Sequence, residues 1–263
     1  MGNSQTHLKG YESKDIQSHY QYVVHLSKME GKEFSMWAIC TKEFRNLFKS
    51  VKSIIVIVII FGVTYLIADI MEKSADQLKE LGLGSDGYAM GTLFIVFLLG
   101  ILFISGLSHD MINREVSSRT MRFLVTKTTR NKIIAGKYLG VWFFWLCCIV
   151  CSFILISLVS KKFLWFNVMD CMTFISVGIA FTILFSVIIP KPSISMFFSI
   201  VFSLAFPALS YWSIYSNNNL VNSFKYLTPY YYSSLGNYFI LINLVYALLV
   251  LFIALALFKR RDL

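Results

Sequence analysis

The sequence predicts an all-α integral membrane protein, in which an N-terminal amphipathic helix in the membrane interface precedes six transmembrane helices and both termini are cytoplasmic. Composition, long uncharged runs and the distribution of basic residues lead to this prediction. Of the 263 residues, 57% are hydrophobic and only 14% are charged, and the mean hydropathy is +0.66. A soluble chain has about a quarter of its residues charged, and a globule of this size could not hide so much apolar surface from water.

Six nearly uncharged runs supply the predicted spans. A helix needs about 20 residues to cross the hydrocarbon core, and most of the runs reach that length. The first run is short, so we expect it to extend to Val51 and Met71. Because the hydrophobic residues are continuous and do not alternate with polar ones, the runs predict helices and not a β-barrel. The runs are residues 54–68, 88–108, 138–160, 172–189, 194–215 and 238–258.

Basic residues are distributed unevenly between the two sides of the predicted bundle. An even number of spans places both termini on one side, together with the segments that follow the second and fourth spans. That side carries 19 of the 24 Lys and Arg residues, and the other side carries five. The positive-inside rule therefore assigns the termini to the cytoplasm. Because this topology accounts for the net charge of +10, we expect the lipid bilayer and no nucleic acid as a partner.

The chain divides into a polar cytoplasmic tail, residues 1–30, and a transmembrane domain, residues 31–263. At the start of that domain, residues 34–51 predict an amphipathic helix that lies in the membrane interface. Lys42 and Glu43 fall on its charged face, which would meet headgroups and water. A helix packed on a cytoplasmic partner is the alternative. The apolar face consists of Trp37, Cys40, Phe44, Leu47, Phe48 and Val51.

The polar segment 109–137, between the second and third spans, carries seven basic residues. Ser117 or Ser118 can cap a short helix, and the sequence TKTTRNKI then breaks it. A short helix with apolar and basic side chains in a cytoplasmic loop suits the docking of a partner protein. In the alternative, Phe123 and Leu124 lie under the membrane while the basic residues bind lipid headgroups.

The predicted outer side has candidate pathway residues in three places. Residues 216–237 mix asparagines with tyrosines around a proline, which fits an aromatic belt or a hairpin that re-enters the outer leaflet. A proline inside the fifth span frees a backbone carbonyl and is expected to bend the helix. An aspartate at the edge of the fourth span fits either the outer interface or a polar site on a transport path. These candidates are Asp170, Pro207, Pro229, Tyr230 and Tyr231.

No catalytic or metal site is expected in this chain. An intramembrane enzyme needs clustered acids, histidines or a nucleophile–base pair, whereas His109 and Asp170 are isolated candidates. The cysteines lack the further ligands that would complete a metal site. A phosphate-binding GxxxxGK[ST] loop would need a glycine at Asn131 and a Ser or Thr after Lys137, and the sequence has neither. We therefore expect this chain to bind no cofactor and no nucleotide.

The polar segment resembles the corresponding part of the permease subunits of type-two ATP-binding cassette (ABC) exporters. After their second span these carry an acidic residue, Gly-Thr, a leucine pair, Thr-Pro-Val-Ser-Arg, and Gly-Lys where the third span begins. Here Arg119 replaces the usual glycine, and TKTTR replaces the turn that contains proline. The layout of the whole chain is also similar. The matching positions are Glu115, Thr120, Phe123, Leu124, Thr126, Arg130, Gly136 and Lys137.

The resemblance implies one half of a membrane channel in a bacterial plasma membrane, paired with a second copy or a sister permease. Cytoplasmic ATPase subunits would bind the ATP and drive it, and the cargo would be a hydrophobic or amphipathic peptide or drug. A membrane sensor or immunity protein that acts without ATP is the alternative. The resemblance also implies a connecting helix that contains Trp37, Phe44 and Phe48. The coupling helix that docks on the ATPase would contain Glu115, Arg119, Thr120, Arg122, Phe123 and Leu124.

Overall fold

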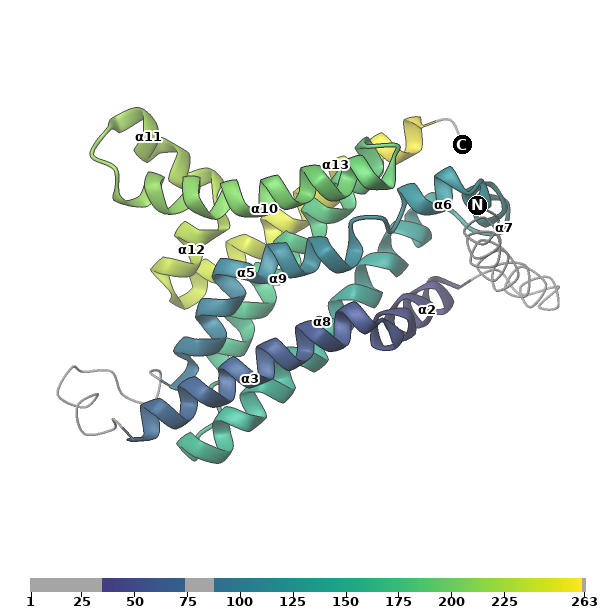
Figure 1. Cartoon of the computed structure of the whole chain (residues 1–263). Helices are drawn as coiled ribbons and strands as arrows, with labels where there is room; N and C mark the ends of the chain where they lie inside the picture. Colours follow the sequence, from purple (N-terminus) through teal and green to yellow (C-terminus); the bar gives the residue numbers. More distant parts are fainter. Residues whose placement is uncertain (1–34, 74–87, 262–263) are drawn as a thin grey trace, which may run out of the picture. The chain divides into compact units, whose positions relative to one another are not determined.

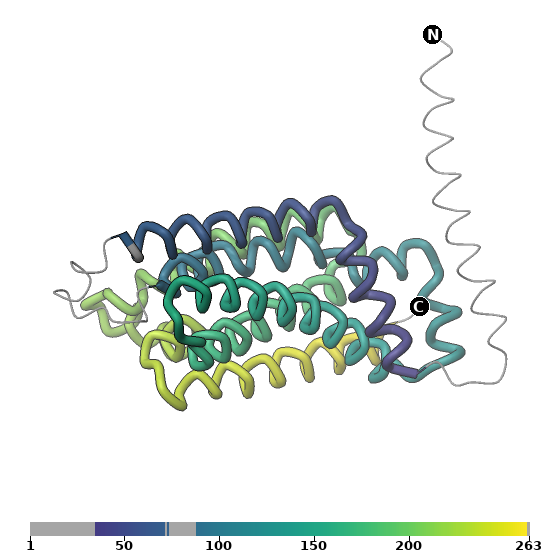
Figure 2. Tube along the Cα trace, turned by 90° about the horizontal axis from the view of Figure 1, so that it is seen from below, coloured from purple at the N-terminus to yellow at the C-terminus, as the bar shows by residue number. Residues whose placement is uncertain are grey.

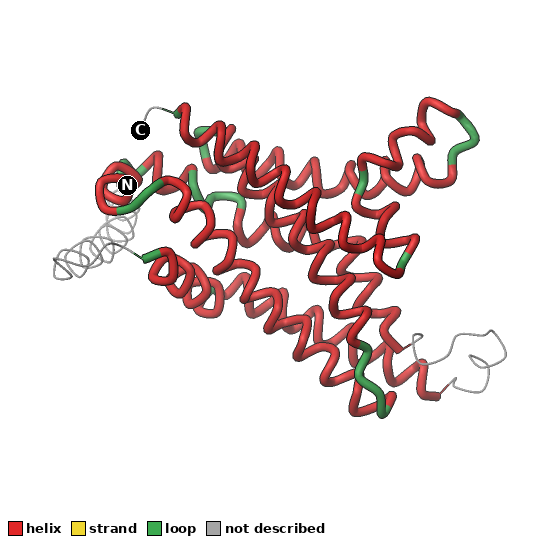
Figure 3. The backbone as a smooth tube through the Cα atoms, turned by 180° about the vertical axis from the view of Figure 1, so that it is seen from behind, coloured by secondary structure: helices red, strands yellow, loops and turns green. Residues whose placement is uncertain are grey.

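The computed structural model describes residues 35–73 and 88–261, apart from the side chain of Glu72. Within these ranges the chain forms helices joined by short connections, and it contains no strand (Figure 3). Six of the helices are long and apolar enough to cross a membrane. The predicted fold class is therefore confirmed. The predicted tail, residues 1–30, and the loop at 74–87 lie outside the described residues.

The spans differ from the predicted runs mainly at their ends. The first span extends to both sides, as expected, whereas the third begins at Arg130 instead of Tyr138. The fourth begins at Trp165, so that Asp170 lies within it and not at its edge. The six spans are α3 (Val51–Lys73), α5 (Met90–Ser108), α8 (Arg130–Ser160), α9 (Trp165–Ile188), α10 (Pro192–Tyr215) and α13 (Ile240–Arg260).

Helix α9 is the most deeply buried of the six spans. It packs against α5, α8 and α13, while α10 packs on α5 and α3 packs on α5 and α8. Its sequence explains this position, because apolar or small residues occur all around the helix and leave no polar face for water. Phe174, Ile175, Val177 and Ala180 are fully buried in it. The less buried spans present their remaining apolar side chains outward, as expected of lipid-facing helices.

Short helices lie at the two ends of the bundle. At one end are α2 (Met36–Lys49), α6 (Asn113–Ser117), α7 (Thr120–Lys127) and the end of α13, and we call this the inner end (Figure 1). At the other, the outer end, lie α11 (Asn219–Ser223), the 3-10 turns Phe224–Leu227 and Asn237–Phe239, and α12 (Pro229–Leu235). Figure 2 shows that α2 leaves the line of α3 and crosses the bundle at the inner end.

Candidate functional site

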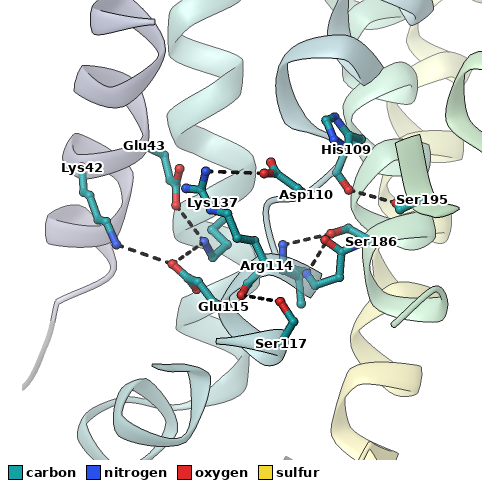
Figure 4. Close-up of polar contacts among 12 residues, drawn as sticks. Lys42, Glu43, His109, Asp110, Arg114, Glu115, Ser117, Lys137, Ser186 and Ser195 are labelled. Carbon is teal, nitrogen blue, oxygen red and sulfur yellow. Dashed lines mark hydrogen bonds and ion pairs between the residues drawn. The ribbon is translucent and has the colours of Figure 1, made fainter. Parts of the chain in front are cut away.

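A cluster of four charged side chains joins α2, α6 and the first part of α8 at the inner end (Figure 4). The Lys137 ammonium lies 2.7 Å from Glu43 Oε1 and 3.1 Å from Glu115 Oε1. Lys42 Nζ lies 3.5 Å from the same Glu115 oxygen. We call these four residues the inner ion cluster. They come from sequence positions almost a hundred residues apart, so the cluster fixes the relative placement of three helices.

The inner ion cluster is largely buried, apart from Lys42 with its side chain 25% exposed, and its charges balance. The side chain of Lys137 is 1% exposed, and those of Glu115 and Glu43 are 12% and 13% exposed. Two ammonium groups face two carboxylates, although Glu115 Oε2 has no hydrogen-bond partner among the described residues. Removing one member of a buried ion pair leaves an uncompensated charge and costs about 3–5 kcal/mol. The cluster therefore holds the three helices together only while it is complete.

Two glycines allow α2 to approach α8 closely enough to form the cluster. A Cβ atom added at Gly136 would lie 2.8 Å from the Met36 carbonyl oxygen, and one at Gly140 would lie 2.8 Å from the Cys40 carbonyl oxygen. These contacts are with backbone, which cannot rotate away. The four-residue spacing places both glycines on one face of α8, as in other close helix pairs. Lys137 lies directly beside this contact, which accounts for its burial.

The loop that enters α6 is anchored to α9 and α10. The Ser186 hydroxyl accepts hydrogen bonds from the backbone N–H groups of Ile112 and Asn113, at 2.9 and 3.2 Å. The Asn113 side chain donates to the Ile189 carbonyl at 3.3 Å, just after the end of α9. Ser195 in α10 donates to the His109 carbonyl at 3.0 Å. Glu115 is therefore carried on a short helix that is fixed on both sides.

Helix α7 begins after a residue with a left-handed backbone. Arg119 has φ 60° and ψ 6°, and it occupies the N-cap position without a side-chain cap. The predicted capping of this helix by Ser117 or Ser118 is therefore wrong. The Ser118 and Thr120 hydroxyls instead lie 2.9 Å from each other, and both lie within hydrogen-bond distance of the Glu115 carbonyl oxygen. A left-handed backbone favours glycine, which explains the glycine that is usual at this position in the resembled permeases.

The six predicted coupling residues divide into an internal and an exposed group. Glu115 and Thr120 make contacts within the protein, and Leu124 is half-buried. Arg119 and Arg122 are exposed, and the Phe123 side chain is 63% exposed. We call these three residues the α7 exposed face. Met121, which is 1% exposed, anchors the opposite side of α7 in the protein.

A second set of contacts ties the start of α8 to the end of the last span. Arg130 Nη1 donates to the carbonyl oxygens of Phe258, Lys259 and Arg261 at 2.6, 2.7 and 3.0 Å. Its guanidinium also lies 5.5 Å from the centre of the Phe258 ring. Carbonyls at a helix C-terminus have no partner within the helix and carry partial negative charge, so a guanidinium stabilises them. These contacts therefore link the C-terminal end of α13 to the start of α8.

The inward contacts of α2 were not predicted from the sequence. Lys42 and Glu43 were expected on the face toward headgroups and water, whereas they contact Glu115 and Lys137. The inward side of α2 also contains Ile39, which is 2% exposed. One side of α2 therefore contacts the protein, and the other side would face the predicted membrane interface. Of the predicted interfacial residues, Trp37 and Phe48 are 58% and 40% exposed, and Phe44 is half-buried.

The predicted basic segment also contained a misassigned lysine. Lys137 was counted among its seven cationic residues, whereas it is buried inside α8. The break at TKTTRNKI is shorter than predicted, because only Thr128 and Thr129 separate α7 from α8. The sequence did contain a signal for the burial of this lysine. It lies between two glycines spaced four residues apart, and that spacing favours a close helix contact.

At the outer end the structure brings several of the predicted pathway residues into contact with α9 and α10. Asp170 is 7% exposed and accepts a hydrogen bond from Ser233 in α12 at 2.8 Å, so its side chain lies between helices of the protein. Tyr230 is 3% exposed, and its ring packs against Phe174 and Phe206 with centroids 4.9 and 6.0 Å away. Burial raises the pKa of the Tyr230 phenol, which therefore keeps its proton at neutral pH.

The other three candidate pathway residues lie in helices, where each has a place in the packing or the helix start. Pro207 is buried within α10, which continues through it to Tyr215. Pro229 is the first residue of α12, where proline lacks an N–H that the helix would not use. Tyr231 is half-buried and lies against Tyr226, and the Lys225 ammonium is 5.1 Å from its ring centre.

A family model described as ABC-2 family transporter protein matches residues 37–214, which is more than half of the chain. The chain belongs to the ABC-2 family of transporter membrane proteins. Among curated proteins, no significant match was found. The membership confirms the resemblance seen in the sequence. It makes this ABC-2 protein a multi-pass membrane transport subunit and not an enzyme, and the family in general works with an ATPase partner.

Proposed function

We propose that this ABC-2 protein forms half of a translocation path and that the α7 exposed face docks on a separate cytoplasmic ATPase subunit. The observation that supports docking is that one side of α7 is exposed while the opposite side is anchored in the protein. Arg119, Arg122 and Phe123 are exposed, while Met121 anchors α7 from below. An exposed aromatic residue flanked by arginines has the composition that is enriched at the centres of protein interfaces.

The inner ion cluster gives this docking surface a rigid base. Lys137 joins α2 to α6, and Gly136 and Gly140 bring α2 onto the backbone of α8. Force applied to α7 would therefore reach α2 and α8 together. Arg130 would carry it on to the end of α13. Closure of the ATPase subunits would thereby bias the spans between inward-open and outward-open arrangements.

The remaining parts of the proposal concern the partners and the cargo. The complex contains a second copy or a sister permease, lies in a bacterial plasma membrane, and binds ATP on the partner subunit and no cofactor on this chain. The cargo is a hydrophobic or amphipathic peptide or drug, with efflux of antimicrobial peptides as the leading case. The composition of the spans supports such cargo, because their polar residues are mostly Ser and Thr, too few to line a broad hydrophilic passage.

Co-purification tests the docking surface directly. We expect an ATPase subunit expressed with the tagged permease to co-purify with it, and we expect Phe123→Asp to reduce the recovered ATPase about tenfold or more, as for loss of an interface anchor. Leu220→Asp is the matched control, because it introduces the same acid at an exposed leucine of the outer end. Equal recovery of the ATPase with wild type and Phe123→Asp would refute the docking surface.

A further inference from the structure

A carboxylate is buried between helices at the outer end of the bundle. Asp170, in α9, is 7% exposed and accepts a hydrogen bond from Ser233 Oγ at 2.8 Å. Asn243, in α13, donates from Nδ2 to the same Ser233 oxygen at 3.1 Å. Three helices, α9, α12 and α13, therefore meet at these polar side chains. We call Asp170, Ser233 and Asn243 the outer polar cluster.

The outer polar cluster has no positive charge of its own. Among residues 35–73 and 88–261, no Lys, Arg or His forms an ion pair with Asp170. A carboxylate that is buried at membrane depth without a cation is unfavourable, and such residues line ligand and ion pathways in membrane proteins. A serine hydroxyl is a weak substitute for a charged partner. Asp170 is therefore stabilised either by a proton or by a cation that the described residues do not supply.

Two neighbouring polar atoms also lack partners. Asn243 is 0% exposed, and its Oδ1 makes no hydrogen bond among the described residues, although the other end of the same amide contacts Ser233. The Tyr230 hydroxyl is likewise buried without a partner in the described part of the chain. The unused acceptors of Asp170 and Asn243 suit a ligand that donates several hydrogen bonds and carries a positive charge.

Aromatic rings lie next to this group. Phe174 follows Asp170 by one turn of α9, and the Tyr230 ring packs on it with a centroid distance of 4.9 Å. Tyr211 packs on Tyr230 in turn, at 5.3 Å. A carboxylate beside aromatic faces is the combination that attracts ammonium groups, because the ring faces are partially negative.

We propose that Asp170 and Asn243 bind one protonated amine group of the transported molecule, with Tyr230 and Phe174 beside it. This inference rests on the proposed transport function, and it narrows the cargo to cationic amphiphiles. The amine would replace the Ser233 hydroxyl as the partner of Asp170. Since Ser233 belongs to α12 and Asp170 to α9, binding would release a contact that holds α12 on the bundle.

Binding of a matched pair of probes to the full-length permease in lipid nanodiscs tests the site. Octylamine is protonated at neutral pH, and octanol has the same chain without a charge. We expect Asp170→Asn to weaken octylamine binding by at least about tenfold, as for loss of a buried charge partner, and to leave octanol binding unchanged. Asparagine keeps the shape of the side chain and can still accept from Ser233. Ser233→Ala removes the competing hydroxyl, so octylamine binding should be retained or strengthened.

Three results would overturn the proposal. Equal octylamine affinity of wild type and Asp170→Asn would mean that the carboxylate does not meet the amine. Equal weakening of octylamine and octanol would mean that the substitution disturbs the bundle. A sodium-dependent rise in the thermal stability of wild type, absent in Asp170→Asn, together with no effect of octylamine, would assign the site to an inorganic cation. Failure here is distinguishable from failure of the proposed function, because ATPase co-purification is measured separately and does not depend on Asp170.

Discussion

The inner ion cluster and the outer polar cluster both bury charged side chains between helices, but they differ in charge balance. At the inner end Lys42 and Lys137 face two carboxylates. At the outer end Asp170 faces a serine hydroxyl and no cation from the described residues. A balanced cluster stabilises one arrangement of its helices, whereas an unbalanced one gains stability when a ligand supplies the missing charge. We therefore expect rigidity at the inner end and ligand binding at the outer end.

Lys137→Met should have the largest effect on stability, because it removes one of the two positive charges of the inner ion cluster. Glu43 and Glu115 would be left buried with only Lys42 nearby, and we expect a loss of about 3–5 kcal/mol in unfolding free energy. Thermal unfolding in detergent measures it. The triple variant Glu43→Gln, Glu115→Gln, Lys137→Met should recover most of the loss, since it removes the unpaired charges. A triple variant that is less stable than Lys137→Met would show that charge balance is not the cause.

Gly140→Val tests whether close backbone contact, and not charge alone, holds α2 on α8. The added side chain would meet the Cys40 carbonyl, and overpacking of this kind costs about 1–3 kcal/mol. Gly106→Val, in α5, is the matched control, because a Cβ there has no neighbour within 4 Å. Unfolding of both variants under the same conditions gives the comparison. Equal loss of stability would attribute the effect to helix propensity.

Arg119→Gly should give the smallest effect, and it should be stabilising. Glycine adopts the left-handed backbone of residue 119 without the steric cost that other residues have, which is about 1–2 kcal/mol. Chemical unfolding should show a gain of roughly that size, offset in part by the greater freedom of glycine in the unfolded chain. A loss of stability would mean that the arginine side chain contributes more than its backbone costs.

The sequence predicted the spans better than the contacts between them. Uncharged runs identify helices that must avoid water, so six spans and the short helix before them could be recognised from composition alone. Helix ends were less predictable, because α8 continues through Arg130 and Lys137, two cations that a hydropathy argument assigns to water. Their partners are Glu43 and the α13 carbonyls, which lie far away in sequence. The contact of Asp170 was unpredictable for the same reason, since its partner Ser233 comes from another helix.

The distance between α2 and α8 during the ATP cycle tests the central claim most directly. Spin labels at Arg45 and Asn131, both exposed, report the separation of these helices in the intact complex with its ATPase. We predict the same distance distribution without nucleotide and with ATP trapped, while labels on α2 and at the outer end of α10 change their separation. A shift in the Arg45–Asn131 distance on ATP binding would contradict the account, because α2 and α8 would then move independently.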